Sequence, residues 1–180
     1  MLFLFDESCN HNDRYGQGNA AMADTVDKAT RSRMMAGIRG KNTKPERAIR
    51  SALHSAGFRY RIHVAELPGK PDIVFPKYKA VIFVHGCFWH RHAGCWWSTT
   101  PSSNAAFWTD KFAKNVERDN RNIGDLKKMG WRVAIVWDCA LRVQLQAEAV
   151  AAIEQWLSRN RGSLILPKRN KMRKLASFFP

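Results

Sequence analysis

The sequence predicts a three-layer α/β domain in which helices flank a mixed β-sheet. Short apolar runs rich in β-branched residues, at 80–84 and 131–137, have the length and composition of buried strands. Stretches with apolar residues three or four positions apart, such as 105–129, are typical of helices that pack one face on a sheet. A chain of 180 residues is long enough for one core and too short for two, so these elements are expected to share one domain.

The net charge is the unusual feature of the composition. With 30 Lys and Arg against 15 Asp and Glu, the chain carries +15, so nucleic acid is the first partner to expect. A basic protein of membrane surfaces would show a strongly amphipathic basic helix or a lipidation motif, and neither is evident. The sequence contains no bilayer-spanning stretch, and residues 1–5 are too short for a signal peptide. We therefore expect a cytoplasmic protein whose four cysteines are thiols or metal ligands.

The beginning of the chain differs from the rest. Residues 6–21 are polar, rich in Gly and Asn and without periodicity, so 1–21 are expected to form a disordered leader. Helical patterning begins after Met22, which suggests that this methionine is the natural start and that the leader is an extension. One folded domain is expected at 22–160, followed by a flexible basic tail at 161–180.

The first helices are expected before residue 57. Residues 24–39 predict a short basic helix or arm that includes Arg31, with a solvated helix face as the simpler alternative. Thr43 as N-cap, followed by a proline and by Glu46, predicts a helix over 43–56. The sequence leaves two interpretations of Glu46 open: it caps this helix, or its carboxylate reaches into a site.

A β-hairpin is expected next. Residues 58–64 alternate as an extended segment, and strands at 71–75 and 79–84 are joined by a short turn, which favours antiparallel pairing. Asp72 opens the first of these strands. It can lie near the segment after Val84 only if the sheet twists or if the near end of the second strand is used, and the sequence alone leaves this geometry open.

Helices and a strand alternate in the second half of the chain. Residues 105–129 predict a long helix, 131–137 a buried strand with Asp138 and Cys139 at its carboxyl end, and 144–159 an amphipathic helix. The buried stripe of the long helix is expected to consist of Trp108, Phe112, Val116, Ile123 and Leu126.

Thiols, imidazoles and indoles are concentrated at 85–97, directly after the strand at 80–84. A hydrophobic core does not require this mixture, whereas a metal or contact with flat rings would. Four of these side chains suit a tetrahedral zinc site, which would be structural and would hold the loop in place. The expected zinc ligands are Cys87, His92, Cys95 and Cys139, and buried reduced thiols are the alternative.

Asp72 directly follows a proline at the start of a strand. This pair resembles an element of restriction-endonuclease-like folds, although the dipeptide is also common in turns. The acidic-x-lysine motif that normally follows in those nucleases is missing, since the corresponding residues 82–85 read IFVH.

Longer motifs carry a more specific resemblance. They are DKATRS at 27–32, LPGKPD at 67–72, VIFVHGCFWH at 81–90, KNVERD at 114–119, GWRV at 130–133 and WDCALR at 137–142. Over about residues 22–156 the chain resembles the very short patch repair DNA mismatch endonucleases, and HGCFWH is the most specific motif. The resemblance implies a restriction-endonuclease-like fold and a monomer that acts on double-stranded DNA, with other mismatch-repair proteins as further partners.

The activity implied by this resemblance is a strand-specific nick 5′ of the T in a T:G mispair, the lesion left when 5-methylcytosine deaminates. Such cleavage needs a metal that stabilises charge on the phosphate and a base of near-neutral pKa. The resemblance implies that Asp72 and the backbone carbonyl of Val84 bind catalytic Mg²⁺. It assigns the general base to His90, oriented by Asp119, although Asp119 would equally fit a cap or pair on its own helix. His85 and Glu46 are implied to support the water shell of the metal. The full set of implied catalytic residues is Asp72, His90, His85, Glu46 and Asp119.

Aromatic side chains are implied to wedge into the base stack beside the mispair. Unstacking is easier at a mismatch, so such a wedge favours damaged sites. Phe107 and Phe112 are instead expected to be core aromatics. The residues implied to contact DNA are Phe88, Trp89, Trp108, Asn115 and Arg31.

Two other functions remain open. One is a restriction-associated nicking nuclease of the same fold with another target. The other is a noncatalytic zinc-stabilised DNA-binding protein, in which Asp72 is only a turn residue.

Overall fold

The computed structural model describes residues 27, 29–30, 32–33, 37, 40–141, 146–159 and 161–167. The expected leader at 1–21, Arg31 and the end of the expected tail at 168–180 lie outside these residues. The helices are α2 (Lys44–Ser55), α3 (Ala105–Lys128) and α4 (Gln146–Arg159), and the strands are β1 (Ile73–Phe75), β2 (Ala80–His85), β3 (Arg132–Trp137) and β4 (Leu164–Leu166). Short 3-10 turns follow β1 and β3, at Pro76–Tyr78 and Asp138–Leu141.

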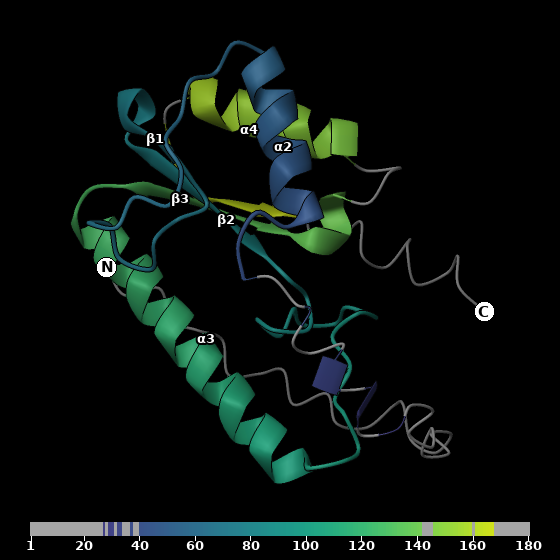
Figure 1. The fold of residues 1–180 in the computed structure, drawn as a ribbon. Coiled ribbons are helices and arrows are strands. Elements are labelled where there is room, and N and C mark those ends of the chain that lie inside the picture. Colours follow the sequence, from purple (N-terminus) through teal and green to yellow (C-terminus); the bar gives the residue numbers. More distant parts are fainter. Residues whose placement is uncertain are drawn as a thin grey trace.

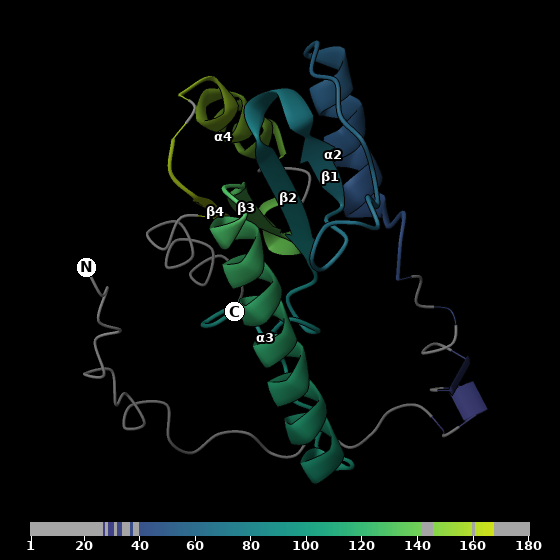
Figure 2. The same cartoon turned by 90° about the vertical axis from the view of Figure 1, so that its left-hand side faces the viewer.

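The four strands form one mixed sheet in the order β1-β2-β3-β4. β1 pairs antiparallel with β2, whereas β2 with β3 and β3 with β4 are parallel. Figures 1 and 2 show α3 on one face of the sheet and α2 and α4 on the other. The predicted mixed sheet flanked by helices is thereby confirmed.

The residues of β2 divide between these two layers. Ile82 belongs to the cluster formed with α2 and α4, which includes Ile49 and Ile153. Val81 and Phe83 point to the opposite face and pack in the cluster that contains Leu126 of α3. Because side chains alternate along a strand and both faces are covered, the whole run is apolar, as in the buried strands of parallel sheets.

The register of the hairpin determines the position of Asp72. Ile73 pairs with Ile82, so Asp72, one residue earlier, lies beside the carboxyl end of β2. The backbone N–H of Val84 donates to Asp72 Oδ2 at 2.7 Å. Antiparallel pairing in this register therefore brings the carboxylate to the end of the second strand, a geometry that the sequence alone had left open.

The end of the domain also differs from the prediction. Residues 161–167 were assigned to a flexible tail, but Leu164–Leu166 form β4 in parallel register with β3. The segment at 58–64, expected to be extended, forms only a single bridge between Arg61 and Val74. A strand of three residues among cationic neighbours has too short a pattern to recognise in advance.

Among the described helices, none is both long enough and apolar enough to cross a membrane.

Candidate active site

The candidate site lies at the carboxyl ends of β2 and β3. These strands are parallel, and their last residues, His85 and Trp137, are paired in register. The loop after His85 and the 3-10 turn after Trp137 therefore leave the sheet side by side, as is usual for ligand sites in α/β proteins. Two groups of polar side chains gather there, one rich in sulfur and one that lines a cleft.

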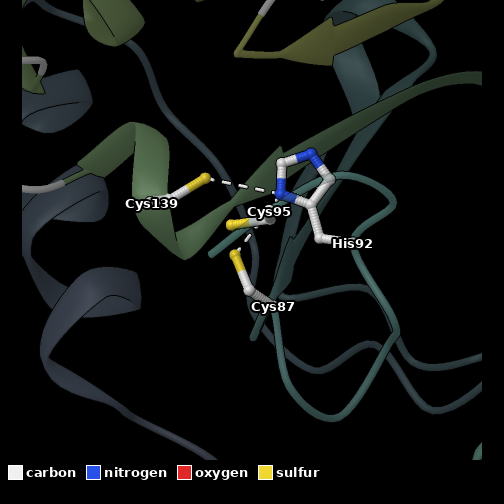
Figure 3. A group of neighbouring side chains, drawn as sticks. All are labelled: Cys87, His92, Cys95 and Cys139. Atoms are coloured by element: carbon white, nitrogen blue, oxygen red, sulfur yellow. Dashed lines mark hydrogen bonds between the residues drawn. The ribbon is translucent and has the colours of Figure 1, made fainter. Parts of the chain in front are cut away.

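The sulfur-rich group consists of the four predicted zinc ligands. One candidate ligand atom from each of them lies within 4.8 Å of those of the others. His92 Nδ1 is 3.4 Å from Cys87 Sγ and 3.4 Å from Cys139 Sγ. Figure 3 shows the three sulfur atoms and this nitrogen turned toward a common centre, with Cys139 reaching in from the turn after β3. The residues Cys87, His92 and Cys139 are buried, and Cys95 is half-buried.

The chemistry of this group suits a thiophilic cation. The hydrogen bond with Cys139 and burial raise the pKa of the Cys87 thiol, so this sulfur stays protonated without a positive partner. It donates to Asp138 Oδ1 at 2.8 Å. Three sulfurs and one imidazole nitrogen are a donor set that zinc prefers, and a bound cation would convert the thiols to thiolates. The group can therefore hold a metal.

Asp72 lies in a cleft of about 1140 Å³ beside the sulfur-rich group. Burial raises the pKa of Asp72 to about 6, and the nearby carboxylate of Glu46 acts in the same direction against the hydrogen bond from Val84. The charged form of this carboxylate is therefore short of positive partners, which a divalent cation would supply. Predicted site residues that line the cleft are Glu46, Asp72, Val84, His85, Trp89, His90 and Asp119.

Both interpretations of Glu46 agree with its position. Its backbone N–H donates to Thr43 Oγ1 at 3.4 Å, and the Thr43 hydroxyl donates to Glu46 Oε1 at 2.9 Å, so it takes part in capping α2. Its side chain also lines the cleft. The buried Arg50 donates to Glu46 Oε2 at 2.9 Å and to the backbone carbonyl of Asp72 at 3.1 Å. Sequence reasoning missed Arg50, although its spacing of four residues from Glu46 on a helix is a recognisable signal.

His90 is held by a carboxylate and by a second imidazole. Its Nδ1 lies 2.5 Å from Asp119 Oδ2, on α3. Its ring stacks on that of His85, with centroids 4.0 Å apart and planes 6° apart. Burial lowers the pKa of His85 to about 3, so this ring is neutral. Although burial opposes it, hydrogen bonding and attraction to His90, together with Arg118, keep the pKa of Asp119 below its ordinary value.

Ligand atoms of His85, His90 and Asp119 also lie within 4.8 Å of one another, as in a metal site. The stacking argues against this use. Each imidazole directs its lone pair in the plane of its own ring, so two stacked rings with parallel planes cannot both aim at one ion. Since Asp119 already engages His90, this group is better suited to holding and moving a proton.

Three of the predicted DNA-contacting rings form one aromatic group. The Phe88 ring lies 5.0 Å from Trp89 and 5.5 Å from Trp108, between centroids. Phe112 packs against Phe88 and is buried, as predicted. Phe107 was expected in the core, but it is 61% exposed at the first turn of α3, so that expectation was wrong.

Asn115 has a different environment from the one expected of a DNA contact. Its side chain is buried on α3, and its Nδ2 donates to the carbonyl of Trp89 at 3.1 Å. In this structure it holds the backbone of the loop that carries the aromatic group.

Comparison with known proteins agrees with the geometry. The family model "DNA mismatch endonuclease Vsr" matches residues 23–97. The DNA mismatch endonuclease Vsr of Escherichia coli (strain K12) is 47% identical over 139 residues, which cover 76% of this chain and 88% of that protein. The chain belongs to the Vsr family of DNA mismatch endonucleases. It is accordingly a phosphodiester hydrolase that acts on DNA, as the motifs predicted.

Other Vsr-family relatives carry a different description. The type II nicking enzyme V.XorIIP of Xanthomonas oryzae pv. oryzae is 49% identical over 120 residues, covering 67% of this chain and 88% of that protein. The type II nicking enzyme V.NmeAIP of Neisseria meningitidis serogroup A is 46% identical over 121 residues, covering 67% and 86%. Membership of the Vsr family therefore establishes a DNA-nicking endonuclease and leaves the target to be argued from the site.

Proposed function

We propose that this Vsr-family endonuclease nicks duplex DNA 5′ of the T in a T:G mispair left by deamination of 5-methylcytosine, in a reaction that depends on Mg²⁺. The observation that carries the proposal is a single cleft lined by the carboxylate of Asp72, by the His90–Asp119 pair and by the aromatic residue Trp89. A hydrolytic centre beside a ring that can enter the base stack is the arrangement that cleavage next to a distorted base pair requires.

Asp72 and the backbone carbonyl of Val84 are the proposed ligands of Mg²⁺. Hard oxygen donors of this kind suit that ion, and the raised pKa of Asp72, about 6, reflects a carboxylate in need of positive charge. When bound, the ion would stabilise negative charge on the phosphate and lower the pKa of a water molecule. Glu46, near Asp72 and held by Arg50, is proposed to support the water shell of the ion.

His90 is the proposed general base. Because its Nδ1 faces Asp119, its Nε2 is the ring nitrogen that remains to take a proton from the attacking water. Asp119 then stabilises the imidazolium that forms and keeps the ring oriented, as in other carboxylate–histidine pairs. The neutral His85 stacks against His90 and adds no competing positive charge to the centre. An imidazole thus takes the duty of the lysine that is absent from 82–85.

Recognition of the mispair is assigned to Phe88, Trp89 and Trp108. These rings contact one another, so they can act as one wedge. Wedging costs a few kcal/mol per base step and less at a mismatch, which favours binding at T:G over paired DNA. A structural zinc ion on Cys87, His92, Cys95 and Cys139 is proposed to fix the loop that carries the first two rings and His90.

A second candidate function is a nick at another target, as part of a restriction-associated system. The observation that favours it is that two relatives of 46–49% identity are described as type II nicking enzymes. Both candidates use the same hydrolytic centre. The two candidates differ in the DNA target that this centre cleaves.

Nicking assays on a set of duplexes that differ at a single base pair distinguish these functions. One duplex carries T:G at a single position, and its controls carry T:A, C:G or another mispair at that position. We expect nicking of the T:G duplex alone, on the strand with the T and only with Mg²⁺. Equal nicking of the paired duplexes would contradict the proposal and favour the second candidate.

A further inference from the structure

Trp137 lies between the two groups of the candidate site. It is the last residue of β3 and is paired in register with His85 at the end of β2. Its ring stacks on that of His92, which belongs to the sulfur-rich group, with centroids 4.2 Å apart and planes 5° apart. It also meets the His85 ring edge to face, at 5.4 Å and 71°. One indole therefore touches a candidate zinc ligand and a candidate catalytic imidazole at once.

The contacts continue to the proposed base. His92 stacks on Trp137, Trp137 abuts His85, and His85 stacks on His90. Flat rings in contact restrict one another's rotation, because a tilt of one ring drives it into its neighbour at the packing density of protein interiors. His85 is buried, so its ring has little room to move away from the indole.

We propose that Trp137 is a positioning residue for catalysis, which transmits the fixed orientation of His92 through His85 to His90. This inference rests on the proposed role of His90 as general base. It assigns the indole a task beyond filling space: it sets the angle at which the two imidazoles meet the water and the phosphate. Orientation of this kind is worth orders of magnitude in rate even when binding is unchanged.

The test uses three variants of the full chain. Trp137→Leu removes the flat face but keeps an apolar side chain, and Trp137→Phe keeps a smaller ring. Trp131→Leu is the matched control, because this half-buried tryptophan lies just before the other end of β3, where its ring meets Lys79. Zinc content, melting temperature, affinity for the T:G duplex and single-turnover nicking rate are measured for each.

We expect Trp137→Leu to nick at least 10-fold more slowly than the parent while it binds DNA within about 3-fold of the parent's affinity. Trp137→Phe should recover part of the lost rate, and Trp131→Leu should nick at the parent rate even though it is less stable. A parent-like rate in Trp137→Leu would overturn the proposal. Equal slowing of Trp131→Leu would also overturn it, because general destabilisation would then explain the loss.

A second measurement is independent of nicking. Aromatic ring currents displace the proton NMR signals of histidines stacked on a tryptophan, and the chain has only six histidines. The signals of His92, His85 and His90 should move in Trp137→Phe and stay in place in Trp131→Leu. The ring of His90 stacks on His85, so the His90 signal is the one that reports transmission. If it does not respond to Trp137→Phe, the proposed transmission is wrong, whatever the target of the enzyme. If it responds and the parent does not nick T:G, the proposed function fails and the positioning of the rings stands.

Discussion

Neighbouring residues fix the position of the His90 imidazole. Asp119 engages one ring nitrogen, and His85 covers one ring face. The tautomer and the orientation of the ring are therefore set before substrate arrives, which is the condition for an efficient general base. At the residue scale, these contacts suit the role of general base proposed for His90 and the orienting role proposed for Asp119.

Asp119→Asn tests this pair. The amide keeps the shape of the side chain but does not stabilise an imidazolium, and it can favour the wrong tautomer of His90. We expect the single-turnover nicking rate to fall by roughly 10²- to 10⁴-fold, the usual contribution of a positioned base, with little change in DNA affinity. Asp110→Asn is the control, because Asp110 lies on the same helix and pairs with the exposed Lys114. A rate within 3-fold of the parent would leave Asp119 with no more than a pairing role.

The beginning of α2 combines a helix cap with a wall of the cleft. Thr43 and Glu46 share the capping hydrogen bonds, and the same glutamate neutralises the buried Arg50, which in turn holds the backbone of Asp72. At the scale of the element, Glu46 therefore combines a capping role with the catalytic role proposed for it. They can be separated by comparing it with its capping partner.

Thr43→Ala and Glu46→Gln form that comparison. Thr43→Ala removes a cap and is expected to lower the free energy of unfolding by about 1 kcal/mol without changing the nicking rate. Glu46→Gln also leaves Arg50 without its carboxylate, so it should cost more stability, about 3 kcal/mol, and should lower the nicking rate. Urea unfolding and single-turnover nicking measure the two effects. If Glu46→Gln nicks as fast as Thr43→Ala, then Glu46 only caps the helix.

The loop between β2 and α3 has little regular structure and depends on its side chains for shape. Hydrogen bonds, stacking and the sulfur-rich group hold it, including the contact of Asn115 with the Trp89 carbonyl. A bound zinc ion would contribute free energy on the order of 10 kcal/mol to this arrangement.

Removal of the proposed zinc ion should therefore abolish DNA binding and nicking while the β-sheet remains folded. We expect Cys95→Ala to lose about one zinc per chain, to melt at a lower temperature and to lose both mismatch binding and nicking. Ser98→Ala, three residues further along the same loop, should keep its zinc and its activity. Full activity in a Cys95→Ala protein that contains no zinc would refute the structural role of the metal.

At the scale of the whole molecule, the cleft at one end of the sheet collects residues from α2, β2, α3 and the loops between the elements, including Asp72 just before β1. Local signals predicted much of this. The β-branched runs, the Thr43 cap and the spacing of thiols and imidazoles depend only on neighbours in sequence. These signals led to the mixed sheet and to the four residues that converge in the sulfur-rich group.

Other features depend on contacts between distant segments and could not be predicted. The hairpin register placed Asp72 beside Val84, and the three-residue β4 forms by pairing with β3. Phe107 is exposed and Asn115 is buried, since periodicity does not tell which side of a long helix the aromatic loop will cover. The position of Trp137 between two groups follows from the pairing of β2 with β3.

The measurement that tests the central claim most directly is single-turnover nicking of a T:G duplex by Asp72→Asn in saturating Mg²⁺. Asp125→Asn serves as the control, since this carboxylate pairs with Lys128 at the end of α3. Loss of a metal ligand removes several kcal/mol of transition-state stabilisation, so we expect Asp72→Asn to nick roughly 10³-fold or more slowly while it still binds the duplex. Nicking by Asp72→Asn at the rate of the parent and of Asp125→Asn would contradict the account.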